Sequence, residues 1–178
     1  MKLTPQGVVK PRRQRPREAV ILFAVANQRF AISADAVHEI RSADSLSGAA
    51  VEIEQRELDK VSHTVERARR VFYIVSASLH FGLRRTRPTM ALMLRESPLA
   101  LLVDRIENMV EISGVYSLPL AFAGEERAWY RGLAYFDDQV IPVVNPLGFL
   151  TANELRMLER TAHRAAVGAS GVRGTVPA

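Results

Sequence analysis

The stretch from Leu99 to Leu150 limits the fold of this chain more than any other. Its apolar residues come in short runs rich in β-branched side chains, and Asp137-Asp138 stands between two of these runs. Short runs of this kind, bounded by turn-forming residues, are typical of β-strands, and an Asp-containing two-residue connection predicts a tight hairpin. We therefore expect a small β architecture in this half of the chain.

Similar runs occur on the N-terminal side of this stretch, and one opens the stretch itself. They predict strands at 19–25, 29–33, 37–41, 71–75, 89–94 and 99–103. The spacing of Val51, Leu58, Val61 and Val65 allows a helix within the charged segment 52–70. A helix is predicted over 151–166, because Thr151 and Asn153 offer capping oxygens and apolar residues recur after them at helical spacing.

The chain carries a weak internal echo. FAISADAVHEI is similar to LALLVDRIENMVEI, and VFYIVSASLHF is similar to VIPVVNPLGF. This indicates a duplicated small β unit, and the lack of strand–helix alternation favours two small barrels over a parallel sheet. We expect a basic disordered tail over 1–17 and one domain over 18–167, followed by a disordered tail over 168–178. Within the domain, barrel halves are expected near 18–87 and 88–150, before the helix at 151–166.

Composition limits the environment and the partners. The chain has 178 residues, 48% of them hydrophobic, and no cysteine, which predicts a folded cytoplasmic protein without disulfides or thiolate metal sites. No apolar run reaches the roughly 20 residues of a membrane span, and the N-terminus lacks the apolar core of a signal peptide. The net charge of +5 comes largely from Lys10, Arg12, Arg13, Arg15 and Arg17. We interpret this tail as solvated; peripheral membrane contact is the first alternative, and nucleic acid is disfavoured because no aromatic residues are interleaved.

Motifs for catalysis and nucleotide binding are absent from the sequence. There is no phosphate-binding Gly-rich loop and no nucleophile elbow in the predicted fold, and the four histidines lack the spacing of a metal site. Asp104 with Glu107, and Asp137 with Asp138, are the paired carboxylates, and we interpret both pairs as structural. We therefore predict no catalytic residue, no metal and no cofactor.

Several of these segments, in order, resemble the CheW-like family, the coupling-protein domain of bacterial chemosensory arrays. The resemblance covers about 19–167 and is carried by the opening hairpin with VHEIR (37–41), LVDRI (102–106), RGL (131–133), VIPVVN (140–145) and the C-terminal helix. It implies a mainly β fold of two intertwined small five-stranded SH3-like β-barrels plus a C-terminal α-helix.

The resemblance also implies a non-catalytic adaptor. Such a protein bridges a methyl-accepting chemoreceptor and the regulatory domain of a chemotaxis-type histidine kinase, and homo-association stays open as a further contact. The receptor side would include Val37, Glu39 and Arg41, together with Arg67 and Arg69. The kinase or array side would include the aromatic residues Phe122 and Trp129, for which burial in the core is an equally open interpretation. The alternative is a basic-tailed β-barrel module that binds an anionic membrane surface or nucleic acid.

One turn departs from the family pattern. The family usually carries Asn-Leu-Arg-Gly before the strand that matches 71–75, whereas this chain reads Glu66-Arg67-Ala68-Arg69. A residue other than glycine adopts positive φ only at a cost. We therefore expect the charged segment before the turn to rebuild it, with consequences for the receptor groove. An unusual receptor or an output such as surface motility would fit this departure.

Overall fold

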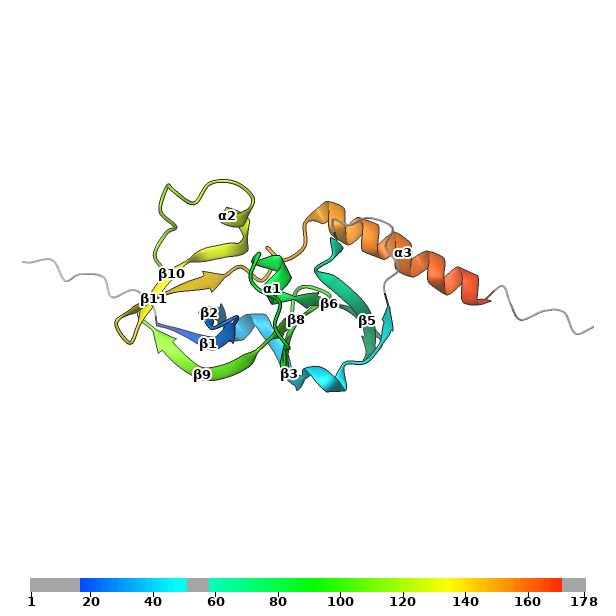
Figure 1. Cartoon of the computed structure of the whole chain (residues 1–178), viewed down its shortest axis with the longest axis horizontal. Coiled ribbons are helices and arrows are strands. Elements are labelled where there is room, and N and C mark those ends of the chain that lie inside the picture. The colour runs from blue at the N-terminus through cyan, green and yellow to red at the C-terminus, as the bar shows by residue number, and fades with distance from the viewer. Residues whose placement is uncertain (1–16, 51–57, 171–178) are drawn as a thin grey trace, which may run out of the picture.

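The chain folds into two β-sheets that pack together, with a helix at the C-terminal end (Figure 1). The computed structural model describes residues 17–50 and 58–170. In the five-stranded sheet the order is β10 (Tyr130–Phe136), β11 (Gln139–Val144), β2 (Gln28–Ser33), β1 (Glu18–Val25) and β9 (Arg105–Ile112). In the six-stranded sheet it is β3 (Val37–Ser42), β7 (Met90–Leu94), β8 (Leu99–Val103), β6 (Arg70–Ser76), β5 (Val61–Arg67) and β4 (Ala49–Ala50). Short helical turns are η1 (Ala34–Ala36), η2 (Ala43–Ser45), α1 (Ala77–His80) and α2 (Glu126–Trp129), and α3 is Ala152–Ser170.

The chain crosses between the sheets twice. It passes from β2 through η1 into β3 of the six-stranded sheet, and it returns from β8 directly into β9 of the five-stranded sheet. The five-stranded sheet therefore combines the first two strands with the last three, and the six-stranded sheet holds everything between. The boundary expected near residue 87 is wrong as a barrel boundary, because β1 and β2 hydrogen-bond to strands from the C-terminal half. The barrels are intertwined.

The echoed segments occupy equivalent places in the two sheets. β11 pairs in parallel with β2, with Val143 opposite Ala31, and β6 pairs in parallel with β8, with Tyr73 opposite Leu99. Each parallel pair thus joins one strand from each of the two echoes, and the two similar crossover segments connect the sheets in opposite directions. This arrangement fits the duplication that the sequence indicates.

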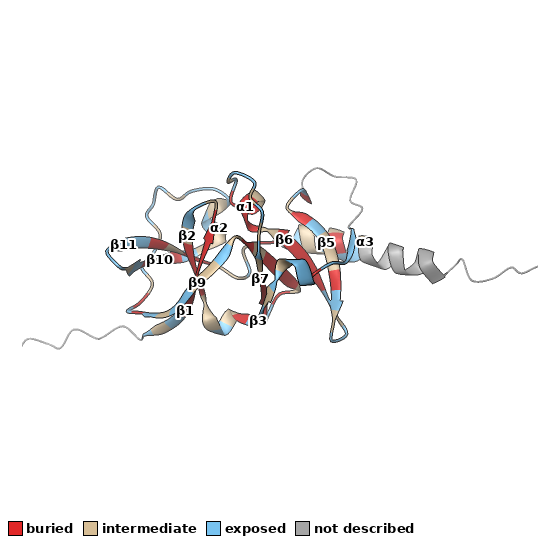
Figure 2. Cartoon of the chain, turned by 60° about the horizontal axis from the view of Figure 1, so that its bottom comes forward, coloured by how far each residue is buried: buried red, intermediate tan, exposed pale blue. Residues whose placement is uncertain are grey.

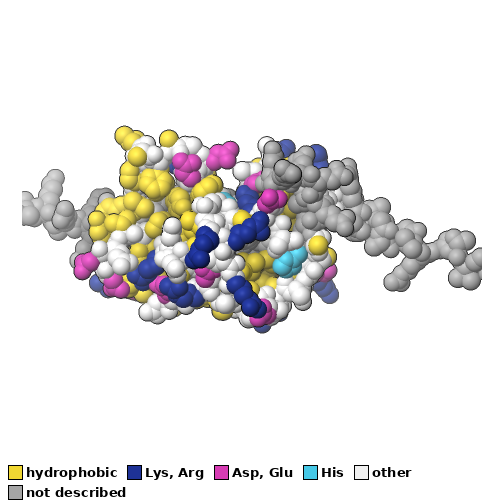
Figure 3. Space-filling view, viewed as in Figure 1, with side chains coloured by type: hydrophobic (Ala, Val, Ile, Leu, Met, Phe, Trp, Pro, Cys, Tyr) yellow, Lys and Arg dark blue, Asp and Glu magenta, His cyan; other side chains and the backbone are white. Residues whose placement is uncertain are grey.

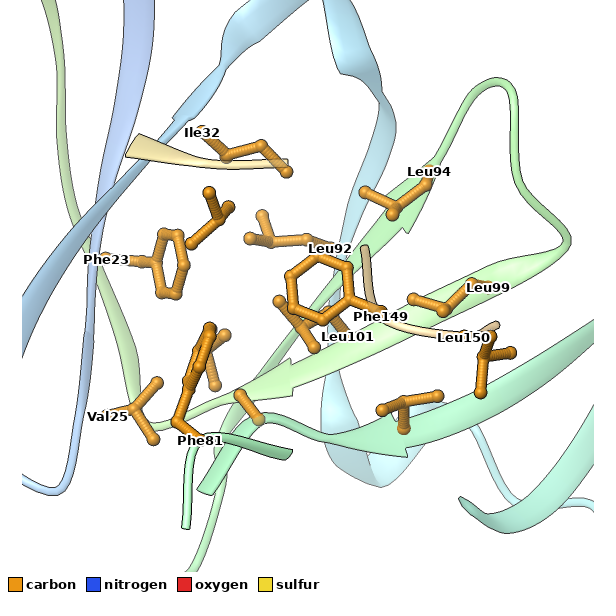
Figure 4. Packing of buried hydrophobic residues seen from close by; sticks show 14 of the residues in the cluster. Phe23, Val25, Ile32, Phe81, Leu92, Leu94, Leu99, Leu101, Phe149 and Leu150 are labelled. Carbon is orange, nitrogen blue, oxygen red and sulfur yellow. The ribbon is translucent and has the colours of Figure 1, made fainter. Parts of the chain in front are cut away.

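The strand β1 is apolar without alternation because both of its faces are covered. Ile21, Phe23 and Val25 belong to the main core, to which both sheets contribute. Val20 and Leu22 face a separate cluster within the five-stranded sheet. Figure 4 shows Phe23, Leu92, Leu101 and Phe149 converging in the main core, and Figure 2 shows buried residues along the inner strands of both sheets. A strand buried on both faces is expected to be continuously hydrophobic.

Residues 61–67 form the strand β5. The helix that the apolar spacing allows over 52–70 is therefore wrong for the part of this segment that the structure describes. Val61 and Val65 are buried in β5, which pairs with β6 in an antiparallel hairpin. β-branched residues at this spacing pack well on a sheet that offers a neighbouring strand. Residues 51–57, including Val51, lie outside the described residues.

The departing turn between β5 and β6 is not rebuilt. Ala68 and Arg69 adopt φ of 50° and 63° within a two-residue hairpin connection. The two other tight hairpins repeat this geometry, at Ala26-Asn27 and at the predicted Asp137-Asp138 turn. Such turns match the right-handed twist of the flanking strands, so sheet pairing imposes the left-handed conformation even without glycine. The expectation of a rebuilt turn is wrong.

Replacing Ala68 by asparagine is expected to raise the free energy of unfolding by about 0.5–1 kcal/mol. The left-handed region costs an ordinary L-residue about 1–2 kcal/mol, and asparagine tolerates it better. Urea unfolding followed by circular dichroism measures the change. Ala49→Asn, in the extended strand β4, is the control and should give no gain. An unchanged midpoint for Ala68→Asn would contradict the assigned turn strain.

The C-terminal helix begins with reciprocal capping bonds. The backbone N–H of Glu154 donates to Thr151 Oγ1 at 3.2 Å, and the backbone N–H of Thr151 donates to Glu154 Oε2 at 2.6 Å. Leu158 is buried in the main core, and Leu155 and Met157 pack against it. The predicted helix is present. Its backbone continues to Ser170, past the tail boundary expected at 168, and residues 171–178 lie outside the described residues.

Candidate partner-binding surfaces

The predicted receptor-side strand, β3, is the first strand in the order of its sheet, and among the described strands it pairs with β7 alone. Its register shifts between Val37 and Glu39, so the alternation of side chains between the two faces of the strand is interrupted there. Val37 is 7% exposed and belongs to the main core. Glu39 is half-buried and forms an ion pair with Arg41, whose side chain is 41% exposed. Val37 therefore anchors the strand, and Glu39 and Arg41 form its polar surface.

Arg67 joins this polar surface from across the sheet. The pKa of Glu39 is lowered, chiefly by the hydrogen bond from Arg41; burial opposes the shift, and the charges of Arg41 and Arg67 add to it. β3 and β5 are not neighbours in the strand order, so the sheet curls to bring Arg67 near Glu39. Arg69 is exposed in the turn beyond β5. The structure thus gathers Glu39, Arg41 and Arg67, and leaves Arg69 at the rim.

The predicted aromatic residues of the second surface lie partly against the core. Trp129, at the end of α2, is half-buried, and its ring centroid lies 4.6 Å from His80 and 6.2 Å from Phe81. The ring of Phe122 is edge-on to Tyr130 at 6.1 Å. Trp129 therefore ties the 113–129 loop to the main core, and Phe122 lies farther out on the same loop.

Sequence reasoning missed the exposed apolar residues around this loop. Leu120 is 95% exposed, Tyr135 61% and Val140 50%, and the ring of Tyr116 lies 6.1 Å from that of Tyr135. Tyr135 and Val140 are direct cross-strand partners in the β10–β11 hairpin. Figure 3 shows apolar side chains gathered over this region. The signal was present in the alternation of RGLAYF, which places Leu133 and Tyr135 on one face. We call Tyr116, Leu120, Tyr135 and Val140 the hairpin surface.

His80 is a further residue that sequence reasoning did not single out. It is 5% exposed, lies among the rings of Phe81, Trp129 and Phe149, and its Nε2 has no hydrogen-bond partner among the described residues. Burial, with a smaller contribution from the charge of Lys60, lowers the pKa of His80 to about 3. The imidazole is therefore neutral near pH 7 and serves as part of the core.

The paired carboxylates have structural partners. Asp104 Oδ2 accepts a hydrogen bond from the backbone N–H of Ala26 at 2.7 Å, and its Oδ1 accepts one from the Thr86 hydroxyl. Glu107 accepts hydrogen bonds from Arg29 at 2.8 Å and Arg105 at 2.9 Å. Across residues 17–50 and 58–170, no three His, Cys, Asp or Glu side chains gather to form a metal site. Asp104 holds the β1–β2 turn and the segment before β7 together.

Replacing Asp104 by alanine is expected to lower the free energy of unfolding by about 2–3 kcal/mol. The change would leave the Ala26 N–H and the Thr86 hydroxyl without their acceptor in a half-buried location. Urea unfolding would measure it. Asp44→Ala, at an exposed position of η2, is the matched carboxylate control, and equal losses for both variants would contradict the role assigned to Asp104.

Comparisons with known proteins agree with this architecture. The model of the CheW-like domain family matches residues 19–154. Among solved structures, the scaffolding protein TtCheW from Thermoanaerobacter tengcongensis is similar, with a TM-score of 0.63 and 14% sequence identity over 73% of this chain and 90% of that chain. No curated protein matches. Among the described residues, no helix is both long and apolar enough to cross a membrane. Because the family match spans most of its length, this chain belongs to the CheW-like domain family.

Proposed function

We propose that this protein is a non-catalytic cytoplasmic adaptor that couples chemoreceptors to a chemotaxis-type histidine kinase. The observation that carries the proposal is the presence of two chemically different surfaces on two different sheets. One is the ionic group of Glu39, Arg41 and Arg67 on the six-stranded sheet. The other is the apolar hairpin surface on the five-stranded sheet. Membership of the CheW-like family and the likeness to a solved scaffolding protein support the same role.

The receptor would contact the ionic group. Glu39 and Arg41 lie on a strand that has one neighbour among the described strands. Arg67 acts on Glu39 from the β5–β6 hairpin, and Arg69 is exposed in its turn. The hairpin keeps a two-residue turn although the glycine is missing. The pairing of its strands therefore fixes the position of these arginines. Charged groups at such an interface contribute mainly to the association rate and to partner choice.

The kinase regulatory domain would contact the other surface. Phe122 and the exposed Leu120 would supply apolar contact area from the 113–129 loop, and Tyr135 and Val140 would supply it from the β10–β11 hairpin. Trp129 would contribute indirectly, because it holds the 113–129 loop against the main core. Aromatic and apolar side chains of this kind commonly dominate interface energetics.

A binding experiment with two partners tests the proposal. The full-length protein and a form lacking residues 1–17 would be used to pull down the kinase regulatory domain and the receptor signalling tip of the same organism, at low and high salt. We expect both forms to bind both partners. Arg67→Glu should weaken receptor binding alone, and Leu120→Glu should weaken kinase binding alone, each by about 10-fold or more.

The two variants control for each other. Loss of both partners in the same variant would contradict the assignment to two surfaces, and no binding by the full-length protein would reject the adaptor role. Binding that disappears with residues 1–17 and at high salt would instead support the alternative of a basic-tailed module.

A further inference from the structure

The connector between α1 and β7 exposes three arginines within four residues. Arg84, Arg85 and Arg87 are all exposed, and none of them makes a hydrogen bond, ion pair or ring contact within the described part of the chain. The segment has neither helical nor strand structure. Charged side chains without a partner inside the protein leave their full hydrogen-bonding capacity for a partner outside it.

The residues between and after the arginines hold this connector in place. The Thr86 hydroxyl donates to Asp104 Oδ1, and the Thr89 hydroxyl donates to the Asp104 carbonyl. The backbone N–H of Thr89 donates to Val103 at 3.1 Å, and that of Leu83 donates to Ser78 at 2.7 Å. Thr86 is half-buried between exposed neighbours. The backbone is thus fixed with the arginines outward, which lowers the entropy lost when a partner binds.

Among the described residues, the acidic residue that contacts the connector, Asp104, is already paired. Both side-chain oxygens of Asp104 accept hydrogen bonds, from Ala26 and from Thr86. Glu107, the next acidic side chain on β9, is already bonded to Arg29 and Arg105. The connector therefore presents three positive charges beside groups that are already paired.

We propose that this arginine connector docks an acidic segment of a protein partner. Arginine forms bidentate pairs with carboxylates and is enriched at protein interfaces, where lysine is depleted, and the connector contains arginine alone. Nucleic acid is disfavoured because no aromatic side chain accompanies the arginines, and a membrane surface requires about four to eight basic groups.

The spacing defines the partner further. Three residue steps of backbone span at most about 10 Å, which is the distance covered by seven residues of a helix. Carboxylates at positions i and i+7 of a partner helix would therefore match the ends of the connector, Arg84 and Arg87. A carboxylate at i+4 lies on the same helix face between them and would meet the long side chain of Arg85. This docking site consists of residues other than those of the receptor-side and kinase-side surfaces and extends the adaptor role.

Fluorescence anisotropy tests the docking site with a labelled helical peptide that carries glutamate at i, i+4 and i+7, and with a glutamine version of it. The full-length protein should bind the glutamate peptide and bind the glutamine peptide at least about 10-fold more weakly, at an ionic strength near 50 mM. The triple variant R84S/R85S/R87S should weaken binding of the glutamate peptide by about 10-fold or more. The control R17S/R156S/R160S has the same net charge and removes exposed arginines elsewhere, so it should change affinity less than about twofold.

Three outcomes would overturn the proposal. The first is that the full-length protein does not bind the glutamate peptide, and the second is that both triple variants bind it equally weakly. The third is that R84S/R85S/R87S loses more affinity for phosphatidylserine vesicles or for a DNA duplex than for the glutamate peptide. Since the assay contains neither kinase nor receptor, it stands apart from the pull-down that tests the adaptor role.

Discussion

Replacing Trp129 by alanine is expected to lower the free energy of unfolding by about 3 kcal/mol, at the lower end of the range for removing a buried Trp side chain. The indole contacts His80, Phe81 and Tyr130, and it packs against the main core while remaining half-exposed. The loss combines reduced burial with the space left beside His80. Because Trp129 is the single tryptophan of the chain, circular dichroism in urea should follow unfolding.

Trp129→Phe is the matched variant, since it keeps a ring against the core and should cost about 1 kcal/mol. Phe122→Ala removes the outer aromatic of the same loop and should cost less than Trp129→Ala, because Phe122 has a ring contact with Tyr130 alone among the described residues. A loss below 1 kcal/mol for Trp129→Ala, with kinase binding abolished, would show that Trp129 is a surface anchor instead of a core residue.

When the pH is lowered from 7 to 4.5, the free energy of unfolding is expected to fall in both the wild type and His80→Phe. The fall in the wild type should be larger by about 2–3 kcal/mol. The pKa of His80 is about 3 in the folded protein, below its ordinary value of 6.5, so the unfolded chain binds the additional proton over this range. The stabilisation from the neutral imidazole is fully present above pH 6.5. It decreases as the pH falls toward 3, where the folded protein also takes up the proton. Each pH unit corresponds to about 1.4 kcal/mol.

Urea unfolding of both proteins at several pH values measures this difference. His80→Phe keeps an aromatic ring among Phe81, Trp129 and Phe149 and removes the titrating nitrogen that has no partner. His38→Gln, which removes an exposed histidine of β3, is the control. Parallel pH profiles for the wild type and His80→Phe would contradict the burial of a neutral His80.

The two predictions concern one structural unit. His80, at the end of α1, and Trp129, at the end of α2, are 49 residues apart in sequence, and their rings are 4.6 Å apart. This contact attaches the loop proposed to meet the kinase to the main core, beside Lys60, whose ammonium lies 2.8 Å from Glu154 at the start of α3. Loosening the aromatic group should therefore affect the loop before it affects the β3 surface.

Local patterns in the sequence determined most of the strands, the opening hairpin, the turn at 137–138, the capped C-terminal helix and the family to which the chain belongs. Each depends on residues within a few positions of one another: turn formers between β-branched runs, or Thr151 three residues before Glu154. The tertiary structure alone decided which strands share a sheet, why β1 is apolar on both faces, and why 61–67 is a strand. Those outcomes depend on partners far along the chain, such as β6 beside β5 and β9 beside β1. The same applies to two electrostatic features. The curling of a sheet brings Arg67 near Glu39, and the exclusion of water from the core keeps His80 neutral; no local spacing encodes either effect.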